Sequence, residues 1–347
     1  MSTLSVEIND PHDMISETSN VVNDLEAAID AKLDLDPIEY KNILVCGMGG
    51  SAIGGDIVAD CLYAHSDKII RVVRSSELPA WADSESLILV SSYSGNTAET
   101  LSVYDKAVAR GCRIVAITSG GKLKDKAIAD GIPYVLVKSG LQPRNAVGNS
   151  IGYMINAIAT IGGPDLRDEV RATIPALKKY IASLSPLDSQ PRKIAGEIMG
   201  SLPVIYSSNS LSAIASRWRA QFNENSKLIA FDGHIPDTNH GDITGMVGCN
   251  GVRIKPIILV EENQSRIFRN TLNATISTLK NRGMKPYVIR IPGKTVFERE
   301  MRAMMLGDFI SLHLAFFKDI DPSDVSSISR LKLAISKRLG RSRKSKR

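Results

Sequence analysis

The stretch ILVCGMGGSAIGG, residues 43–55, joins an apolar run to a glycine-rich turn and then to an apolar, helix-like segment. The stretch LILVSSYSGNTAET, residues 87–100, repeats this design with hydroxyl side chains in place of most glycines. An apolar run without alternation is typical of a strand buried on both faces, and helices between such strands imply right-handed parallel crossovers. Both stretches therefore predict strand, turn and helix units of a parallel sheet.

Further apolar runs extend this pattern along the whole chain. In the first half they lie at residues 69–73, 114–118 and 134–137, and in the second half at residues 204–206, 257–260 and 287–291. A helix-like segment between the halves, residues 146–161, ends at a Gly-Gly-Pro sequence. We expect an α/β protein with two domains, each a parallel sheet flanked by helices in three layers, the first sheet having five strands.

The length of 347 residues suits two domains of about 150 residues each. We place a helical lead at residues 1–38, the first domain at 39–163 and the second domain at 164–335. The net charge of +6 is concentrated at the end, because seven cations lie in residues 337–347 and the rest of the chain carries −1. We expect residues 336–347 to form a basic, disordered tail with no specific nucleic-acid partner, since aromatic residues do not interleave with it.

Other partners and compartments are limited by composition. No apolar stretch reaches the roughly 18 residues that a membrane-spanning helix needs, and the acidic start does not resemble a signal peptide, so we expect a cytoplasmic protein. The four cysteines show no CxxC spacing, and no histidine pair has metal-binding spacing. We therefore expect neither a disulfide scaffold nor a metal site.

The glycine-rich turn is the first candidate binding loop. Gly49, Gly50 and Ser51 let backbone amides approach a ligand, and the helix that follows favours an anion at its N-terminus. The turn also fits the dinucleotide pattern G-x-G-x-x-A. A dinucleotide site normally has an acidic residue after the second strand, where this chain has Arg74. An NADP site with Arg74 at the 2′-phosphate is the weaker alternative.

The hydroxyl-rich turn is the second candidate binding loop. Ser92, Ser94 and Thr97 lie at a strand end that leads into a helix, where hydroxyl and amide donors form a nest for an anion. No P-loop lysine is adjacent, so nucleoside triphosphate chemistry is disfavoured. Capping of the helix by Ser94 or Thr97 is the plainer interpretation, but residues 91–100 hold five Ser or Thr hydroxyls, more than a cap needs. The loop predicts binding of a phosphomonoester.

Taken together, these loops resemble those of the sugar isomerase (SIS) domain. In the second half, RWRAQFNENSK at residues 217–227 is similar to the Asn-Glu-Asn segment of the bifunctional phosphoglucose/phosphomannose isomerases of archaea and some bacteria. Further similarity lies in QPR at 142–144, in the Asn-His pair at 239–240, and in the closing segment from 321 to 332. The resemblance spans residues 40 to 335 and implies two SIS-type domains.

The resemblance also implies an activity and the residues that carry it. Aldose–ketose isomerisation of glucose 6-phosphate to fructose 6-phosphate needs a base, an acid that opens the sugar ring and a group that stabilises the cis-enediolate. By resemblance Glu224 is the base and Arg144 stabilises the enediolate. His240, supplied by the neighbouring subunit, opens the ring with Lys332. The implied enzyme is a homodimer that needs no cofactor.

Each of these roles has a plainer alternative in the sequence. Glu224 alone reads as a solvent-exposed carboxylate paired with Lys227, and Arg144 as part of a linker salt bridge. His234 is a second histidine near His240. Two lysines compete with Lys332 for the closing role, Lys318 and Lys337.

The substrate is the least defined part of the prediction. In the dual-specificity enzymes a threonine of the closing segment assists the mannose epimer, whereas residues 323–329 hold no threonine and Val325 stands near that position. Activity on mannose 6-phosphate is therefore less supported than activity on glucose 6-phosphate. An isomerase of another phosphosugar is an alternative, as is a noncatalytic SIS protein that senses a phosphosugar. Only about 40 residues precede the first predicted strand, so we do not expect the DNA-binding module that SIS regulators usually carry.

Overall fold

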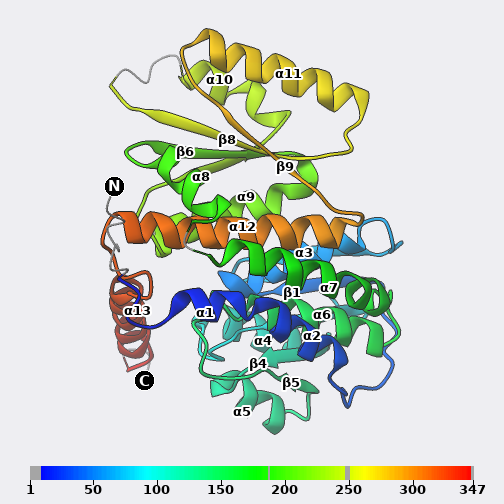
Figure 1. Ribbon diagram of the computed structural model, residues 1–347. Helices are drawn as coiled ribbons and strands as arrows, with labels where there is room; N and C mark the ends of the chain where they lie inside the picture. Colours follow the sequence, from blue (N-terminus) through cyan, green and yellow to red (C-terminus); the bar gives the residue numbers. More distant parts are fainter. Residues whose placement is uncertain (1–8, 187, 247–250, 345–347) are drawn as a thin grey trace.

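The computed structural model describes residues 9–186, 188–246 and 251–344, so Cys249 lies outside the described residues. Two parallel sheets lie one above the other with helices between and around them (Figure 1). The first sheet consists of β1 (Asn42–Cys46), β2 (Ile69–Val73), β3 (Ser86–Ser91), β4 (Arg113–Thr118) and β5 (Tyr134–Leu136). The second sheet consists of β6 (Leu202–Ser207), β7 (Phe231–His234), β8 (Ile254–Glu261) and β9 (Tyr287–Ile291).

The strand orders are β2-β1-β3-β4-β5 and β7-β6-β8-β9, and every pairing is parallel. The helices of the first half are α1 (Met14–Ser19), α2 (Val21–Asp30), α3 (Gly50–Leu62), α4 (Ala98–Ala109), α5 (Gly121–Ala129) and α6 (Val147–Thr160). Those of the second half are α7 (Arg167–Leu184), α8 (Gln190–Ile198), η1 (Asn209–Leu211), α9 (Ser212–Glu224), η2 (Asp237–His240), α10 (Asp242–Gly245), α11 (Arg266–Asn281), α12 (Val296–Phe317) and α13 (Ser326–Lys344). The predicted two-domain parallel α/β fold is confirmed.

The central strands β1, β3 and β4 of the first sheet are buried on both faces, as their uninterrupted apolar runs predict. Leu44 and Ile88 pack into a core with α4 and α5, whereas Val45 and Leu89 pack into a second core on the opposite face. Successive side chains of a strand point to opposite faces, so a strand covered on both sides must be apolar at every position.

The second core continues from the first domain into the second. It includes residues of α2, α3 and α6 from the first domain and of α9, α12, β6 and β8 from the second. Figure 1 shows α12 running the width of the molecule between the two sheets. An added Cβ at Gly307 of α12 would lie 2.1 Å from Nε1 of Trp218 in α9, so only glycine allows these two helices to approach so closely. The two domains therefore share one packed layer of helices.

Two elements differ from the sequence expectation. β7 has the sequence FDGH, which contains no apolar run, and it forms the edge of the second sheet. The last helix, α13, continues to Lys344 and takes in most of the segment expected to be a disordered tail. Lys, Arg and Leu have high helix propensity, and no proline interrupts residues 326–344. Side chains beyond Ile335 lie outside the described residues.

The domain boundary expected at residue 163 falls in the connection between α6 and α7. α7 packs against both α2 and α12, so it belongs to the shared helical layer. None of the helices among the described residues combines the length and the apolar character needed to cross a membrane.

Candidate active site

The hydroxyl-rich turn connects β3 to α4 in a tightly packed conformation. Gly95 has a φ of 64°, and an added Cβ would lie 1.8 Å from the carbonyl oxygen of Gly120. Thr97 is the N-cap residue of α4, but its side chain makes no capping hydrogen bond and its Oγ1 accepts one from Ser92 Oγ at 3.2 Å. Ser94 Oγ accepts from the backbone N–H of Asn96 at 3.3 Å. Helix capping therefore does not account for the hydroxyl of Thr97.

The two binding loops open into one cavity of about 270 Å³. The start of α3 contributes Gly50 and Ser51, and the start of α4 contributes Thr97. Two helix N-termini thus border the same space, with unpaired backbone N–H groups and positive partial charges that favour an anion. The lining is Met48, Gly49, Gly50, Ser51, Ser91, Ser92, Tyr93, Ser94, Thr97, Gln142, Pro143, Arg144, Glu224, Val325, Ile328 and Lys332. The cavity includes every sequence-predicted site residue except His240.

Arg144 lines this cavity and is 5% exposed. Its Nε donates to Oδ1 of Asn225 at 2.7 Å, and its Nη2 donates to the carbonyl oxygen of Pro322 at 2.6 Å. Its Nη1 lies 3.8 Å from Oε2 of Glu224. Burial lowers the pKa of Arg144 from its ordinary value, and the negative charge of Glu224 opposes that shift. The guanidinium is therefore fixed in place with one edge directed toward Glu224.

A buried polar network holds Arg144 and Asn225 from behind. Arg217 donates to Asp308 from Nε at 2.9 Å and from Nη2 at 2.7 Å, and Nη2 also donates to the carbonyl oxygen of Arg144 at 3.0 Å. Asn225 Nδ2 donates to Ser311 Oγ at 2.8 Å. Because a buried network with satisfied partners is rigid, α9 and α12 define the positions of both groups.

Glu224 is the last residue of α9, and its side chain is 33% exposed, in the cavity. The alternative interpretation, in which its carboxylate pairs with Lys227, does not match the structure. Lys227 has a φ of 48°, and its Nζ donates to the carbonyl oxygens of Glu224 at 2.7 Å and Asp321 at 3.1 Å. Burial and the nearby Arg144 lower the pKa of Lys227. The Glu224 carboxylate faces Arg144 and the open space of the cavity.

Lys332 reaches the cavity from α13, together with Ile328. The competing Lys318 donates from Nζ to the carbonyl oxygens of Ser226 at 2.7 Å and Lys227 at 3.1 Å, so its ammonium group ties two backbone segments together. The side chain of Lys337 lies outside the described residues. Of the two competing lysines whose side chains the structure describes, Lys332 lines the cavity and Lys318 does not.

Comparison with known proteins shows the family of the chain. The sequence model of the bacterial phospho-glucose isomerase C-terminal SIS domain matches residues 187–335. A bifunctional phosphoglucose/phosphomannose isomerase of Aquifex aeolicus is 34% identical over 89% of this chain and 94% of its own length. The chain belongs to the bifunctional phosphoglucose/phosphomannose isomerase family.

Other similarities of this isomerase are broader. A D-glucosamine-6-phosphate 4-epimerase of Sulfolobus acidocaldarius is 30% identical over 70% of the chain and 78% of its own length. The crystal structure of a hypothetical protein from Thermus thermophilus superposes with a TM-score of 0.76 at 16% identity, over 95% of this chain and 91% of the other. That likeness concerns the fold, and it agrees with two SIS-type domains.

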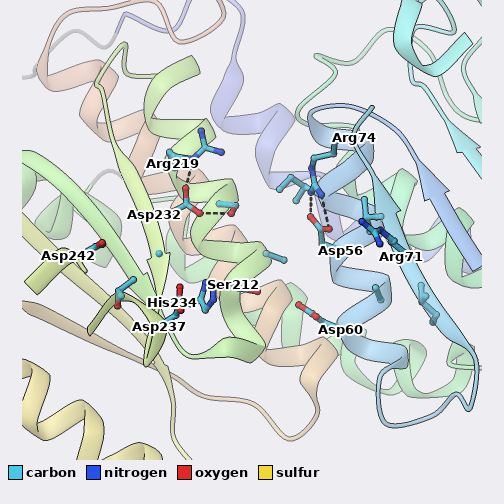
Figure 2. Close-up of a pocket in the computed structure, with 18 of the residues that line it drawn as sticks. Asp56, Asp60, Arg71, Arg74, Ser212, Arg219, Asp232, His234, Asp237 and Asp242 are labelled. Atoms are coloured by element: carbon cyan, nitrogen blue, oxygen red, sulfur yellow. Dashed lines mark hydrogen bonds and ion pairs between the residues drawn. The ribbon is translucent and has the colours of Figure 1, made fainter. Parts of the chain in front are cut away.

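His240 lines a different and larger cleft of about 1080 Å³. Figure 2 shows this cleft between α3 and β2 on one side and α9 and β7 on the other. His240 lies in η2 at its border, and His234 lines the same cleft. A single copy of the isomerase thus does not bring His240 to Glu224.

Each wall of this cleft contains one ion pair. Arg74 donates to Oδ1 of Asp56 at 3.1 Å on the first-domain side, and Arg219 lies 2.5 Å from Asp232 on the second-domain side (Figure 2). Arg74 therefore forms an ion pair with Asp56. It lines this cleft and does not line the cavity of the glycine-rich turn. The arrangement gives no support to the NADP alternative.

Some site residues were not predicted. Tyr93 and Gln142 line the cavity, and both lie inside motifs that the sequence analysis quoted. The sequence analysis also did not identify Asp308, although it is the one acidic residue in the mostly apolar stretch 303–317. A charged residue inside an apolar helix indicates a buried partner, here Arg217.

Among the described residues, no group of three or more His, Cys, Asp or Glu side chains is arranged to hold a metal ion.

Proposed function

We propose that the protein is a homodimeric aldose–ketose isomerase that interconverts glucose 6-phosphate and fructose 6-phosphate through a cis-enediolate without a cofactor. The observation that carries this proposal is that the hydroxyl nest, Glu224 and Arg144 line one cavity of about 270 Å³. A hexose phosphate bound by its phosphate in the nest extends its carbon chain toward the carboxylate. Membership of the phosphoglucose/phosphomannose isomerase family supports the same conclusion.

The phosphate group is held by Ser51, Ser92, Ser94 and Thr97 together with the N-termini of α3 and α4. Hydroxyl and backbone N–H donors suit the three terminal oxygens of a phosphomonoester, and the two helix dipoles add favourable charge. Binding energy gained at the phosphate orients the reacting carbons and lowers the barrier to a step that takes place elsewhere on the sugar.

Ring opening precedes the proton transfer. His240 of the partner subunit donates a proton to the ring oxygen while the hydroxyl at C1 gives its proton to solvent water, and Lys332 hydrogen-bonds the sugar oxygens during this step. An imidazole exchanges protons near neutral pH, which suits it for this role. The products of the step are an open chain and a C1 carbonyl.

Isomerisation then moves one proton between neighbouring carbons. Glu224 removes the proton from C2, which gives the cis-enediolate, and returns it to C1 while the hydroxyl proton of O2 passes to O1. Arg144 donates hydrogen bonds to the enediolate oxygen, where negative charge develops. Because Arg144 is buried and already oriented, it stabilises that charge without rearranging. The 3.8 Å separation of Arg144 Nη1 from Glu224 Oε2 exceeds a hydrogen-bond distance, so the Glu224 carboxylate is able to turn to the substrate while Arg144 stays in place.

Dimerisation accounts for the position of His240. The cleft that holds His240 is bordered by β2 and β7, each of which is one of the two edge strands of its sheet. Ile69 of β2 is 70% exposed and Phe231 of β7 is 53% exposed. Unpaired edges with exposed apolar residues are typical of surfaces that another chain covers. In the proposed dimer this face meets a second copy, which places His240 at the partner's cavity.

The proposed substrate is glucose 6-phosphate ahead of mannose 6-phosphate. Val325 and Ile328 of the closing segment line the cavity with apolar side chains, and residues 323–329 supply no threonine. A threonine hydroxyl would hydrogen-bond a sugar hydroxyl there, whereas Val325 does not. A cytoplasmic location remains a prediction from the sequence.

The decisive test is Glu224→Gln in a coupled assay that contains a chelator. Glutamine has the shape of glutamate but does not accept the C2 proton, so we expect kcat for glucose 6-phosphate to fall by roughly 10²-fold or more. Glu262→Gln, on the surface of the second domain, is the matched control and should keep the wild-type rate. Full turnover by a folded Glu224→Gln protein would eliminate the proposed base.

The same assay separates the remaining candidates. The similarity to a D-glucosamine-6-phosphate 4-epimerase favours a test of amino-sugar phosphates as a second class of substrate. Wild-type protein should therefore be compared on glucose, mannose and glucosamine 6-phosphates. Conversion of glucosamine 6-phosphate alone would transfer the assignment to that substrate. Binding of a sugar phosphate without turnover of any of the three would favour the noncatalytic sensor.

A further inference from the structure

The segment that carries Arg144 has no regular secondary structure and is held by two side chains from other parts of the molecule. The backbone N–H of Leu141 donates to Oη of Tyr93 at 2.8 Å. The next backbone N–H, that of Gln142, donates to Oε1 of Glu17 at 2.5 Å. Tyr93 belongs to the phosphate-binding turn, but Glu17 comes from α1, in the helical lead to which the sequence assigned no role.

α1 is itself firmly anchored. Met14 is fully buried in a cluster with Leu312 and Phe316, so α1 packs against the C-terminal half of α12 (Figure 1). Oδ1 of Asp10 accepts from the N–H of Met14 at 2.7 Å at the start of the helix. Glu17 lies one turn further along and is half-buried. It is therefore attached to the same long helix that supports the network behind Arg144.

The charge of Glu17 is also close to the site. Arg144 is buried, and the two carboxylates that most oppose the lowering of its pKa are those of Glu224 and then Glu17. Glu224 lines the cavity and is assigned to the reaction, but Glu17 is not among the lining residues. Glu17 thus contacts the backbone of the Arg144 segment without lining the cavity that a substrate would fill.

We propose that Glu17 is a positioning residue, which holds the backbone of residues 141–144 through the N–H of Gln142 so that Arg144 meets the reacting carbons. The inference rests on the proposed function and deepens it. When the Glu17 carboxylate is removed, the N–H of Gln142 loses its acceptor. Only the hydrogen bond from Leu141 to Tyr93 then holds the backbone on the N-terminal side of Arg144. Small displacements of an oriented group lower the rate of reaction much more than they weaken binding at a distant phosphate.

The test compares Glu17→Ala, Glu17→Gln and the control Glu26→Ala. Glutamine keeps an oxygen that accepts from the Gln142 N–H, whereas alanine removes it. Glu26 lies on α2 and pairs with Lys178 at 2.5 Å, away from the cavity. We expect Glu17→Ala to lower kcat roughly tenfold or more with KM for glucose 6-phosphate unchanged within about twofold. Glu17→Gln and Glu26→Ala should retain wild-type values of both.

Hydrogen exchange provides a readout that does not depend on turnover. In Glu17→Ala the amide of Gln142 should exchange faster in a peptide covering residues 138–146, and in Glu17→Gln it should remain protected. Unchanged exchange in Glu17→Ala, or an equal loss of kcat in both Glu17 variants, would overturn the inference. A loss confined to KM would also overturn it. Failure of the proposed function would instead appear as an inactive wild type or an active Glu224→Gln protein.

Discussion

Asp308 is the counter-ion of the buried Arg217 in the network behind the cavity. It accepts two hydrogen bonds from the Arg217 side chain and a third from Gln221 Nε2 at 3.0 Å. Arg217 and Asp308 have side chains that are each 3% exposed, so neither charge has water as an alternative partner. A buried ion pair adds little net stability, but removing one member leaves the other uncompensated.

Asp308→Asn is therefore expected to lower the free energy of unfolding by about 3 kcal/mol, because Arg217 keeps its charge and loses its counter-ion. The measurement is denaturant unfolding of the purified protein at neutral pH. Asp165→Asn removes a surface partner of Arg167, whose pair is largely exposed, and should change stability by less than about 1 kcal/mol. Equal effects of the two substitutions would contradict the role given to Asp308.

At the scale of elements, sequence reasoning succeeds where burial is uniform. The strands β1, β3 and β4 appear as apolar runs because both faces of the sheet are covered. β7 was missed because an edge strand has few buried positions and its FDGH sequence gives no apolar signal. Lys332 and Glu224 were chosen by resemblance to a family, and spacing along the chain alone does not bring α13 to the end of α9.

A prediction at the scale of elements concerns the lysine that α13 brings to the cavity. Lys332→Met removes the ammonium group and keeps an unbranched apolar side chain, so we expect kcat for glucose 6-phosphate to fall by roughly 10²-fold. Lys318→Met is the comparison, and it should lower stability more than the rate in the folded fraction, because Lys318 Nζ binds backbone carbonyls. Steady-state kinetics and thermal unfolding of both variants separate the roles. Higher activity in Lys332→Met than in Lys318→Met would favour Lys318 as the closing lysine.

At the scale of the whole molecule, an acidic pair lies where the two domains meet. Glu300 of α12 is fully buried, and Cys61 Sγ of α3 donates to its Oε2 at 3.7 Å. Burial and the neighbouring Asp60 raise the pKa of Glu300 well above its ordinary value. Burial also raises the pKa of Asp60 to about 6. The contact between α3 and α12 therefore retains protons that the unfolded chain releases.

The raised pKa values of Asp60 and Glu300 determine how the stability of the protein changes with pH. Because the folded state binds these protons more tightly than the unfolded state, stability from the pair is complete below the ordinary carboxyl pKa values and declines as the pH rises through about 6. Glu300→Gln removes one titrating group, so its midpoint of thermal unfolding should fall less between pH 5 and pH 8 than that of the wild type. Parallel pH profiles for the two proteins would show that Glu300 is not the group responsible.

The cavity joins segments from opposite ends of the chain. Met48 and Gly49 follow the first strand, while Val325, Ile328 and Lys332 come from the beginning of α13, the final helix. During translation both sheets and α12 emerge from the ribosome before Lys332 does. A nascent polypeptide that stops after α12 possesses all the strands that the structure describes and still lacks one wall of the proposed substrate cavity. Premature stop codons late in the message are thus expected to produce well-folded, inert protein.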